Sequence, residues 1–479
     1  MLFHLVRKEI LDSLLNQRFV AIAVFSMVLM PPSAFINYEY YEARKAAFDR
    51  QLAEYQAEDP SSSNLRAYRA PVVLSALARG TEPYMPIYFA FSRDANATTA
   101  GNIEAQDFST LSTFGSFDFL FLVQVVFSLL AVLLAFDMIS GEKERGTLRA
   151  VLANQVPRDS ILFGKLLGGY TVLWFTFLVG SLLLYLVLGA YDSRFFEAEA
   201  VSRIGFMFAM SSIFLAGFFA MGLMVSTFCH SSRTAIVVLL LMWVVLQLVI
   251  PKAGEKIAAI ALPTASQESI RIEKAGIVDD LSQEMREKAG ELYMCLSGND
   301  SIRGAFEFVR RETPESRQFR TEYLEIAQSY DRRQRDRVRE IDLEFMRQKE
   351  SQRGLSRAIS LLSPASALTF FVSNEAGTRD LAYEGYRNAV HAHYQIIDQT
   401  IFAHQRSNRL EVGMEGMVMM GNLGAEDPPP WDAPPSFEVR EPQLSNVLRS
   451  NVWAMVSLLA YLFIPFLVSY VAFLRYDVR

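Results

Sequence analysis

Six long apolar segments, separated by charged stretches, are the feature that most constrains the fold of this chain. Of its 479 residues, 51% are hydrophobic and 20% are charged, and the two kinds are segregated along the sequence. Each apolar segment has about the length, roughly 20 residues, that a helix needs to cross a bilayer. We therefore expect an all-α integral membrane protein with six transmembrane helices. The predicted spans are residues 19–36, 114–137, 166–189, 204–228, 234–252 and 451–474.

The fourth and fifth predicted spans differ in composition. Residues 234–252 are rich in Leu and β-branched side chains, which favours contact with lipid. Small side chains let helices approach closely in lipid, so we expect the fourth span inside the bundle. Its small residues are Ala209, Ser212, Ala216, Gly217, Ala220 and Gly222.

The segment before the first span, residues 1–18, is predicted to form an amphipathic helix on the inner membrane surface. Its apolar side chains recur at helical spacing. They are Leu2, Leu5, Val6, Ile10 and Leu14. A cleaved signal peptide is disfavoured, because Arg18 interrupts, the apolar run after it is long, and no small-residue cleavage site follows cleanly.

Basic residues in the short loops predict the orientation. Lys and Arg of the N-terminal helix, of residues 138–165, of the 229–233 turn and of the tail 475–479 all fall on one side. Cytoplasmic loops carry an excess of these residues. An even number of spans places both chain ends together, so we expect both termini in the cytoplasm.

The same topology leaves two large regions, residues 37–113 and 253–450, on the extracytoplasmic side. The first opens helically, and its later part is expected to be irregular because Pro and Gly interrupt it. The second is mostly helical by pattern, and its charged run 314–353 would extend about 60 Å as a helix. A solvated stalk or a helical hairpin is predicted there. The apolar segment 355–372 is split by Pro364 and is expected at the outer membrane interface.

Motifs for ATP hydrolysis or other catalysis are missing from the sequence. The nearest string to a phosphate-binding loop, FGKLLGG, lacks the first glycine and the hydroxyl residue. Neither H-E-x-x-H nor G-x-S-x-G occurs. The net charge of −6 gives no reason to expect nucleic-acid binding. Carboxylates of the spans are limited to Asp118 and Asp137 near the ends of the second, so no proton relay is visible. We predict no catalytic site and no cofactor in this chain, and an external source of energy.

Candidate metal ligands are few and have ordinary alternative explanations. The helical spacing of His391, His393 and His404 does not bring them to one ion, so packed or solvated side chains are favoured. Four extracytoplasmic methionines offer soft ligands for Cu(I), but packing in irregular apolar contacts is the favoured interpretation. They are Met414, Met417, Met419 and Met420.

Residues 138–165 form a short, charge-dense insert between the second and third spans. Glu142 and Glu144 lie where a helix N-terminus prefers acidic groups. An apolar edge then recurs at helical spacing. Its residues are Thr147, Leu148, Val151 and Leu152. Such a helix can dock in a groove of another protein, and the alternative is a solvated loop.

The sequence ISGEKERGTLRAVLANQVPRDSILFGKLLGGY, residues 139–170, resembles the ABC type-2 permease family. It is similar to that family's pattern G-E-x-E-x-G-T, followed by a small-residue helix, a proline-containing turn and x-G-K-x-x-G at the third span. The six spans, the interfacial N-terminal helix and the closing YDVR agree with this resemblance. The branch that it resembles is labelled as multicopper-enzyme maturation permeases, with gliding-motility permeases among them. The resemblance covers the spans, about half of the chain. Residues 253–450 and the enlarged first outer region depart from the minimal fold, so no substrate is carried over.

The resemblance implies the membrane subunit of an ATP-driven exporter in the bacterial cytoplasmic (inner) membrane. It implies a partner ATPase in two copies that binds ATP, and a second permease that is identical or homologous. The insert would be the coupling helix that contacts the ATPase. The contact residues implied are Gly141, Glu142, Glu144, Arg145, Gly146, Thr147 and Leu148.

Three functional hypotheses follow. The favoured one is an exporter permease whose outer domain recruits or guides something beyond the membrane. The second, motivated by the long charged helices, is a device in which ATP hydrolysis moves the outer stalks to act on an extracytoplasmic partner protein. A membrane-tethered enzyme has only the histidines and methionines to support it.

Overall fold

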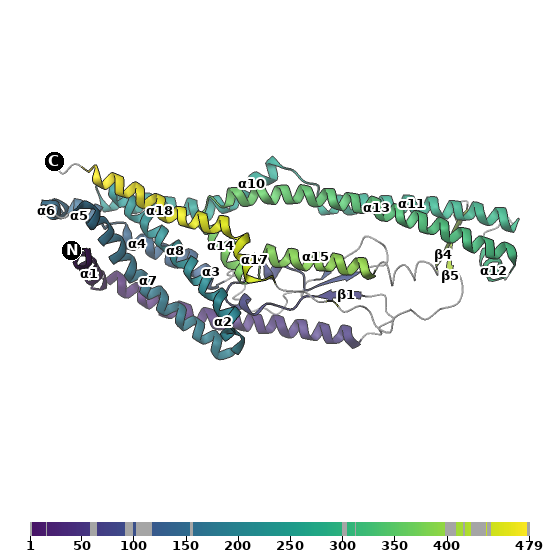
Figure 1. The fold of residues 1–479 in the computed structure, drawn as a ribbon, viewed down its shortest axis with the longest axis horizontal. Helices are drawn as coiled ribbons and strands as arrows, with labels where there is room; N and C mark the ends of the chain where they lie inside the picture. Colours follow the sequence, from purple (N-terminus) through teal and green to yellow (C-terminus); the bar gives the residue numbers. More distant parts are fainter. Residues whose placement is uncertain are drawn as a thin grey trace.

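The computed structural model is an elongated, mainly helical molecule (Figure 1). It describes residues 2–15, 17–57, 65–91, 99–101, 117–153, 157–298, 304–311, 313–397, 409–414, 417–422, 437 and 442–476. Within these residues six helices are long and apolar enough to cross a membrane, which confirms the predicted all-α class and identifies a multi-pass membrane protein. They are Phe19–Ala57, Phe119–Glu144, Arg158–Tyr191, Ala198–Phe228, Ser232–Ala261 and Val452–Leu474.

Helix α8 (Ala198–Phe228) lies inside the bundle of spans. Of its most apolar window, 72% is buried, against 17% for the following span, Ser232–Ala261. Small residues allow this packing, since a Cβ atom at Gly222 would lie 2.4 Å from that of Ala135 in the second span. The predicted difference between the fourth and fifth spans is thereby confirmed.

Both ends of the described chain lie at the same end of the molecule (Figure 1). Helix α1 (Leu2–Leu14) is there, together with the short helices α5 (Ser140–Glu144) and α6 (Thr147–Ala153) of the insert. We call this the insert end. Helix α7 (Arg158–Tyr191) rises from it and packs against both α1 and α2 (Gln17–Ala57).

Helices α11 (Gln267–Ser297) and α13 (Pro314–Ser360) run side by side away from the spans (Figure 1). We call this pair the stalk. Its longer helix has 47 residues, which corresponds to about 70 Å. Thr313 and Ser316 form a reciprocal capping box at its first turn, where Pro314 needs no amide partner.

The far tip of the stalk has its own small apolar core. Tyr293 of α11 and Phe319 and Tyr323 of α13 are buried there with Val412. Val412 belongs to β4 (Arg409–Met414), which pairs with β5 (Met417–Asn422) as an antiparallel hairpin. This hairpin carries the methionine-rich sequence. The side chains of Met414, Met417, Met419 and Met420 lie outside the described part of the structure, and their copper interpretation stays a prediction.

A small β-containing unit joins the first outer region to the second. Strands β1 (Leu65–Tyr68), β2 (Tyr88–Phe91) and β3 (Thr99–Gly101) form an antiparallel sheet in the part expected to be irregular. Helix α15 (Asp380–Ile397) packs on this sheet, and its Tyr386 hydroxyl donates to the Ala67 carbonyl at 2.9 Å. The two outer regions therefore share one structure.

The segment 355–372 forms the last turns of α13 and most of helix α14 (Pro364–Glu375), and its place at the outer membrane interface stays a prediction; the structure adds that α14 is buried by protein. Eleven of its twelve residues are buried, and it packs against α8 and α18 (Val452–Leu474). Hydrogen bonds from polar side chains are made where the helical backbone is interrupted before α14. The Ser363 hydroxyl donates to the Leu246 carbonyl at 2.5 Å, and Gln124 Nε2 donates to the Ala365 carbonyl at 2.7 Å. Gln124 lies in a π-helical turn of the second span. Non-helical backbone is tolerated among spans only where protein groups satisfy it in this way.

Candidate functional site

The insert is built as a helix, a glycine and a second helix. Gly146 separates α5 from α6 and has a φ of +73°, a left-handed conformation that favours glycine. A Cβ atom at this position would meet no other atom within 4 Å. The requirement for glycine is therefore conformational rather than steric.

Helix α5 is hydrogen-bonded to the end of α8, to the start of α9 (Ser232–Val244) and to the turn between them. The Ser226 hydroxyl accepts hydrogen bonds from the amides of Ile139 and Ser140, at 3.0 and 2.9 Å. The Glu144 carboxylate accepts one from the Ser232 amide at 3.1 Å. Lys143 Nζ donates to the Cys229 carbonyl at 3.3 Å. The insert is thus attached to the end of the fourth span as well as to the second and third.

A buried charge cluster joins the insert to α1 and α7. Lys165 Nζ lies 2.7 Å from Glu142 Oε1 and 3.4 Å from Glu9 Oε1. The Lys165 side chain is only 5% exposed, and its two partners are 17% and 14% exposed. Removing one member of a buried ion pair leaves an uncompensated charge, so this cluster holds its three helices in one arrangement.

Close packing of α1 on α7 brings Glu9 into this cluster. A Cβ atom at Gly168 would lie 2.6 Å from the Cβ atom of Glu9, and one at Gly164 would lie 3.1 Å from that of Leu5. The two glycines therefore let the helices approach closely enough for the Glu9 carboxylate to reach Lys165.

The apolar side of α6 faces the protein itself. Leu148 is only 1% exposed and packs with residues of α7, α8 and α18. These neighbours are Ile161, Leu162, Leu223 and Phe473. Arg158 adds a polar connection, because its Nη1 donates to the carbonyls of Leu474 and Tyr476 at 2.7 and 2.9 Å. The last turn of the sixth span is thereby attached to the insert as well.

The opposite side of the insert is open to solvent. We call the exposed residues between positions 144 and 150 the insert ridge. They are Glu144, Arg145, Gly146, Thr147, Arg149 and Ala150. Of the predicted contact residues, four belong to this ridge, whereas Gly141 and Leu148 are buried and Glu142 is partly buried in the charge cluster.

The predicted contact residues do not include Arg149 and Ala150 of the ridge, although the helical spacing of Leu148, Val151 and Leu152 leaves these two positions on the outward side of α6. Sequence reasoning also missed Glu9, Lys165 and Ser226 as partners of the insert. Glu9 and Lys165 are 156 positions apart, so no local pattern reports their pairing.

The described residues contain no group of three His, Cys, Asp or Glu side chains placed to hold a metal ion. The His393 ring packs against Phe91 and Phe437, with centroid distances of 5.7 and 5.2 Å. His391 lines a cavity discussed below, and His404 lies outside the described residues.

Comparison with known families gives one result that spans the chain. The model of the ABC-2 family transporter protein matches residues 3–478, a range that includes the insert and also the outer region 253–450. No curated protein matches the chain. Because the match extends from α1 to the end of the sixth span, the chain belongs to the ABC-2 family of transporter proteins.

Proposed function

We propose that this chain is the permease subunit of an ABC exporter, and that its insert ridge receives the ATPase subunit. The family and the six spans support a permease. The observation that carries the docking proposal is the geometry of the insert. One side is solvent-exposed, and the other is fastened to five of the helices around it.

This arrangement would allow the insert to transmit force from the ridge to the spans. Force on the ridge would pass through Ser226 to the fourth span, through Lys165 to α1 and the third span, and through Arg158 to the sixth. Packed helices respond to such force by rigid-body or shear displacement. ATP would be hydrolysed on the partner, two ATPase subunits would act on two permeases, identical or homologous, and the insert end would face the cytoplasm of a bacterial inner membrane.

The docking proposal is tested by reversing charge on the ridge. We expect Arg149→Glu to reduce co-purification of the ATPase at least about tenfold, because complementary charges fix the register of an interface. Arg475→Glu is the matched control, since Arg475 is exposed at the end of the sixth span but outside the ridge. Glu142 and Leu148 are unsuited to this test, because both have partners inside the permease.

Equal recovery of the ATPase with the ridge variant and with unmodified protein would contradict the proposal. Equal loss with the ridge variant and with Arg475→Glu would also contradict it, because the effect would then follow net charge rather than position. Thermal unfolding of each variant in detergent checks that the fold is retained.

A second candidate, a mechanical device acting on an extracytoplasmic partner, is favoured by one observation. Helix α13 runs without interruption from the stalk tip to Ser360, and α14 then packs directly among the spans. Motion of the spans would therefore be carried to the tip. Spin labels at the exposed positions Gln283 and Arg50 measure this. An ATP-dependent change in their distance supports the device, and an unchanged distance contradicts it.

A further inference from the structure

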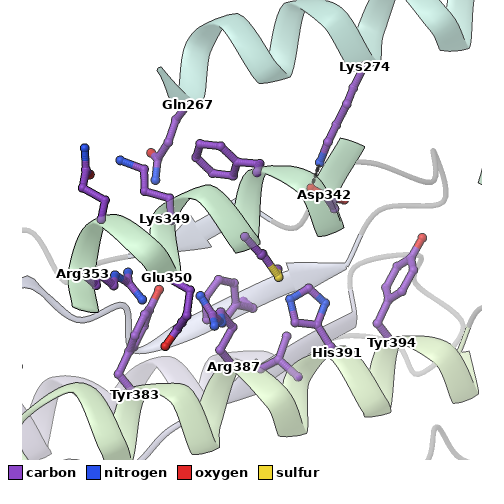
Figure 2. Close-up of a pocket in the computed structure, with 15 residues that line it drawn as sticks. Gln267, Lys274, Asp342, Lys349, Glu350, Arg353, Tyr383, Arg387, His391 and Tyr394 are labelled. Atoms are coloured by element: carbon purple, nitrogen blue, oxygen red, sulfur yellow. Dashed lines mark hydrogen bonds and ion pairs between the residues drawn. The ribbon is translucent and has the colours of Figure 1, made fainter. Parts of the chain in front are cut away.

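A cavity of about 450 Å³ lies between the stalk and α15 (Figure 2). Figure 2 shows Tyr383, Arg387 and His391 extending from α15 toward α13, with Lys274 and Gln267 approaching from α11. This volume is in the range of small-ligand sites. The cavity is far from the insert, and the proposed ATPase docking assigns no role to it.

The cavity wall has an excess of positive charge. Four cations line it, Lys274, Lys349, Arg353 and Arg387, against two carboxylates, Asp342 and Glu350, which leaves a net charge of two positive. Lys274 is ion-paired with Asp342. The nearest carboxylate oxygen to Arg353 is that of Glu384, at 3.9 Å from its Nη1.

Arg387 and Lys349 are the cations without a carboxylate partner among the described residues. Arg387 Nε is buried and has no hydrogen-bond partner, which is unfavourable for a guanidinium donor. Lys349 Nζ lies 5.7 Å from the centre of the Phe345 ring, a contact that leaves its three donor hydrogens free for an anion. The forked donors of arginine match phosphate oxygens in particular.

The remaining wall is apolar and aromatic. Phe89 comes from β2, Phe345 and Met346 from α13, and Val390 from α15. Arg353 lies seven residues before Ser360, where α13 reaches the spans, a separation of about 10 Å along the helix. The cavity therefore lies just beyond the point where the stalk meets the spans, and its lining suits an anionic group with an attached apolar part.

We propose that this cavity binds a phosphate group, carried by the head group of an anionic lipid or by a soluble phosphate ester. Arg387 supplies the forked hydrogen-bond donors for the phosphate oxygens, Lys349 adds positive charge to the cavity wall, and Phe89, Met346 and Val390 contact the remainder of the ligand. The existing Lys274–Asp342 pair closes one side of the site.

His391 gives the site a dependence on pH. Loss of surrounding water and the cations Arg387 and Lys274 lower the pKa of His391 below its ordinary value, and Asp342 opposes this. A bound anion favours the protonated imidazole, so binding takes up a proton and strengthens as the pH falls. Arg387, Asp342 and Lys274 act on His391 directly. The other charged and titratable groups that line the cavity are Lys349, Glu350 and Arg353 of α13 and Tyr383 and Tyr394 of α15.

The experiment uses the full-length protein, purified in a neutral detergent. Titration calorimetry with inorganic phosphate and with glycerol 3-phosphate tests the soluble source, and glycerol is the uncharged control. Native mass spectrometry of retained phosphatidylglycerol against phosphatidylcholine tests the lipid source. We expect Arg387→Gln to weaken the phosphate-dependent signal at least about tenfold and Lys349→Gln to weaken it less. Arg347→Gln, an exposed change on α13 outside the cavity, leaves it unchanged.

A sulfate titration tests the pH dependence, because the charge of sulfate is constant over this range. Binding is expected to tighten between about pH 7.5 and about pH 5.5, and His391→Gln should remove this change. The proposal is overturned if neither soluble phosphate nor phosphatidylglycerol is preferred over its control. It is also overturned if Arg387→Gln and Lys349→Gln, each with an unchanged unfolding temperature, bind as Arg347→Gln does.

Discussion

At the insert end, the buried Lys165 ammonium has two carboxylate partners, whereas around the stalk cavity the Arg387 guanidinium has a buried Nε atom with none. Both cations are held between helices that are distant in sequence. The first is neutralised within the fold, so it fixes the relative positions of α1, α5 and α7. The Arg387 guanidinium lacks a hydrogen-bond acceptor at Nε, so binding of an anion would supply the missing acceptor and negative charge. We therefore propose that the paired cation is a structural connection and that the incompletely paired cation beside the cavity belongs to a binding site.

The largest effect in this comparison is expected from Lys165→Met. This change leaves Glu142 and Glu9 partly buried without their cation, and we expect the free energy of unfolding to fall by about 3–5 kcal/mol. Denaturant unfolding in detergent measures it. The control is Lys8→Met on α1, whose pair with Asp12 is exposed and is expected to contribute about 0.5 kcal/mol. Similar losses for the two variants would show that the Lys165 cluster is no structural connection.

Glu375, at the end of α14, extends the comparison to a buried carboxylate. Both of its oxygens are buried without a hydrogen-bond partner, and burial raises its pKa from 4.5 to about 7, although Arg203 opposes the shift. The pKa of Glu375 is higher in the folded protein than in the unfolded chain. Its contribution to the free energy of unfolding is therefore fully present below about pH 4.5 and is lost as the pH rises to about 7, where the buried carboxyl ionises. We expect Glu375→Gln to stabilise the protein at about pH 8 by about 3 kcal/mol relative to about pH 4.5.

Unfolding midpoints at the two pH values give the measurement for Glu375→Gln. The exposed change Glu344→Gln on α13 is the control and should show no such difference between the two conditions. An equal stabilisation by Glu375→Gln at both pH values would show that burial does not raise the pKa of Glu375.

A smaller effect is expected at the glycine between the two insert helices. Gly146→Ala places a side chain at a φ of +73°, which is expected to lower the free energy of unfolding by about 1–2 kcal/mol. The strained backbone would lie within the insert ridge. Gly276→Ala in α11 is the control, since this glycine is helical and open and alanine should stabilise it by about 0.5–1 kcal/mol. Thermal unfolding compares the two, and opposite signs are predicted.

The smallest effect on stability is expected from Arg387→Gln. With no anion present, removal of an incompletely bonded guanidinium should change the free energy of unfolding by less than about 1 kcal/mol, in the stabilising direction. The same denaturant experiment as for Lys165→Met measures it. A loss as large as that of Lys165→Met would mean that Arg387 is a structural cation, and the contrast between the two regions would disappear.

The sequence was sufficient for the parts of this molecule that depend on local composition. Apolar length predicts the six spans, and the small residues of the fourth span predict its burial. The helical periodicity of α6 also indicates that Leu148 lies on its apolar side, where the structure buries it. The resemblance to the family motif instead placed Leu148 among the residues that contact the ATPase. Local sequence patterns do not predict contacts between segments that are distant in the sequence. Tertiary packing alone brings Glu9 to Lys165, and it alone brings together Lys274, Asp342 and Arg387. The burial of helix α14 was not predicted, because it depends on contacts with Gln124 and Leu246 of other spans.

We propose that the insert ridge is the surface through which an ATPase drives this permease. A photoreactive amino acid at position 149, compared with one at position 475, tests it most directly. Both positions are exposed, and only the first belongs to the ridge. The account predicts a cross-link from position 149 to a protein that mass spectrometry identifies as an ABC ATPase, and none from position 475. Absence of that cross-link in a complex that still hydrolyses ATP would contradict the account.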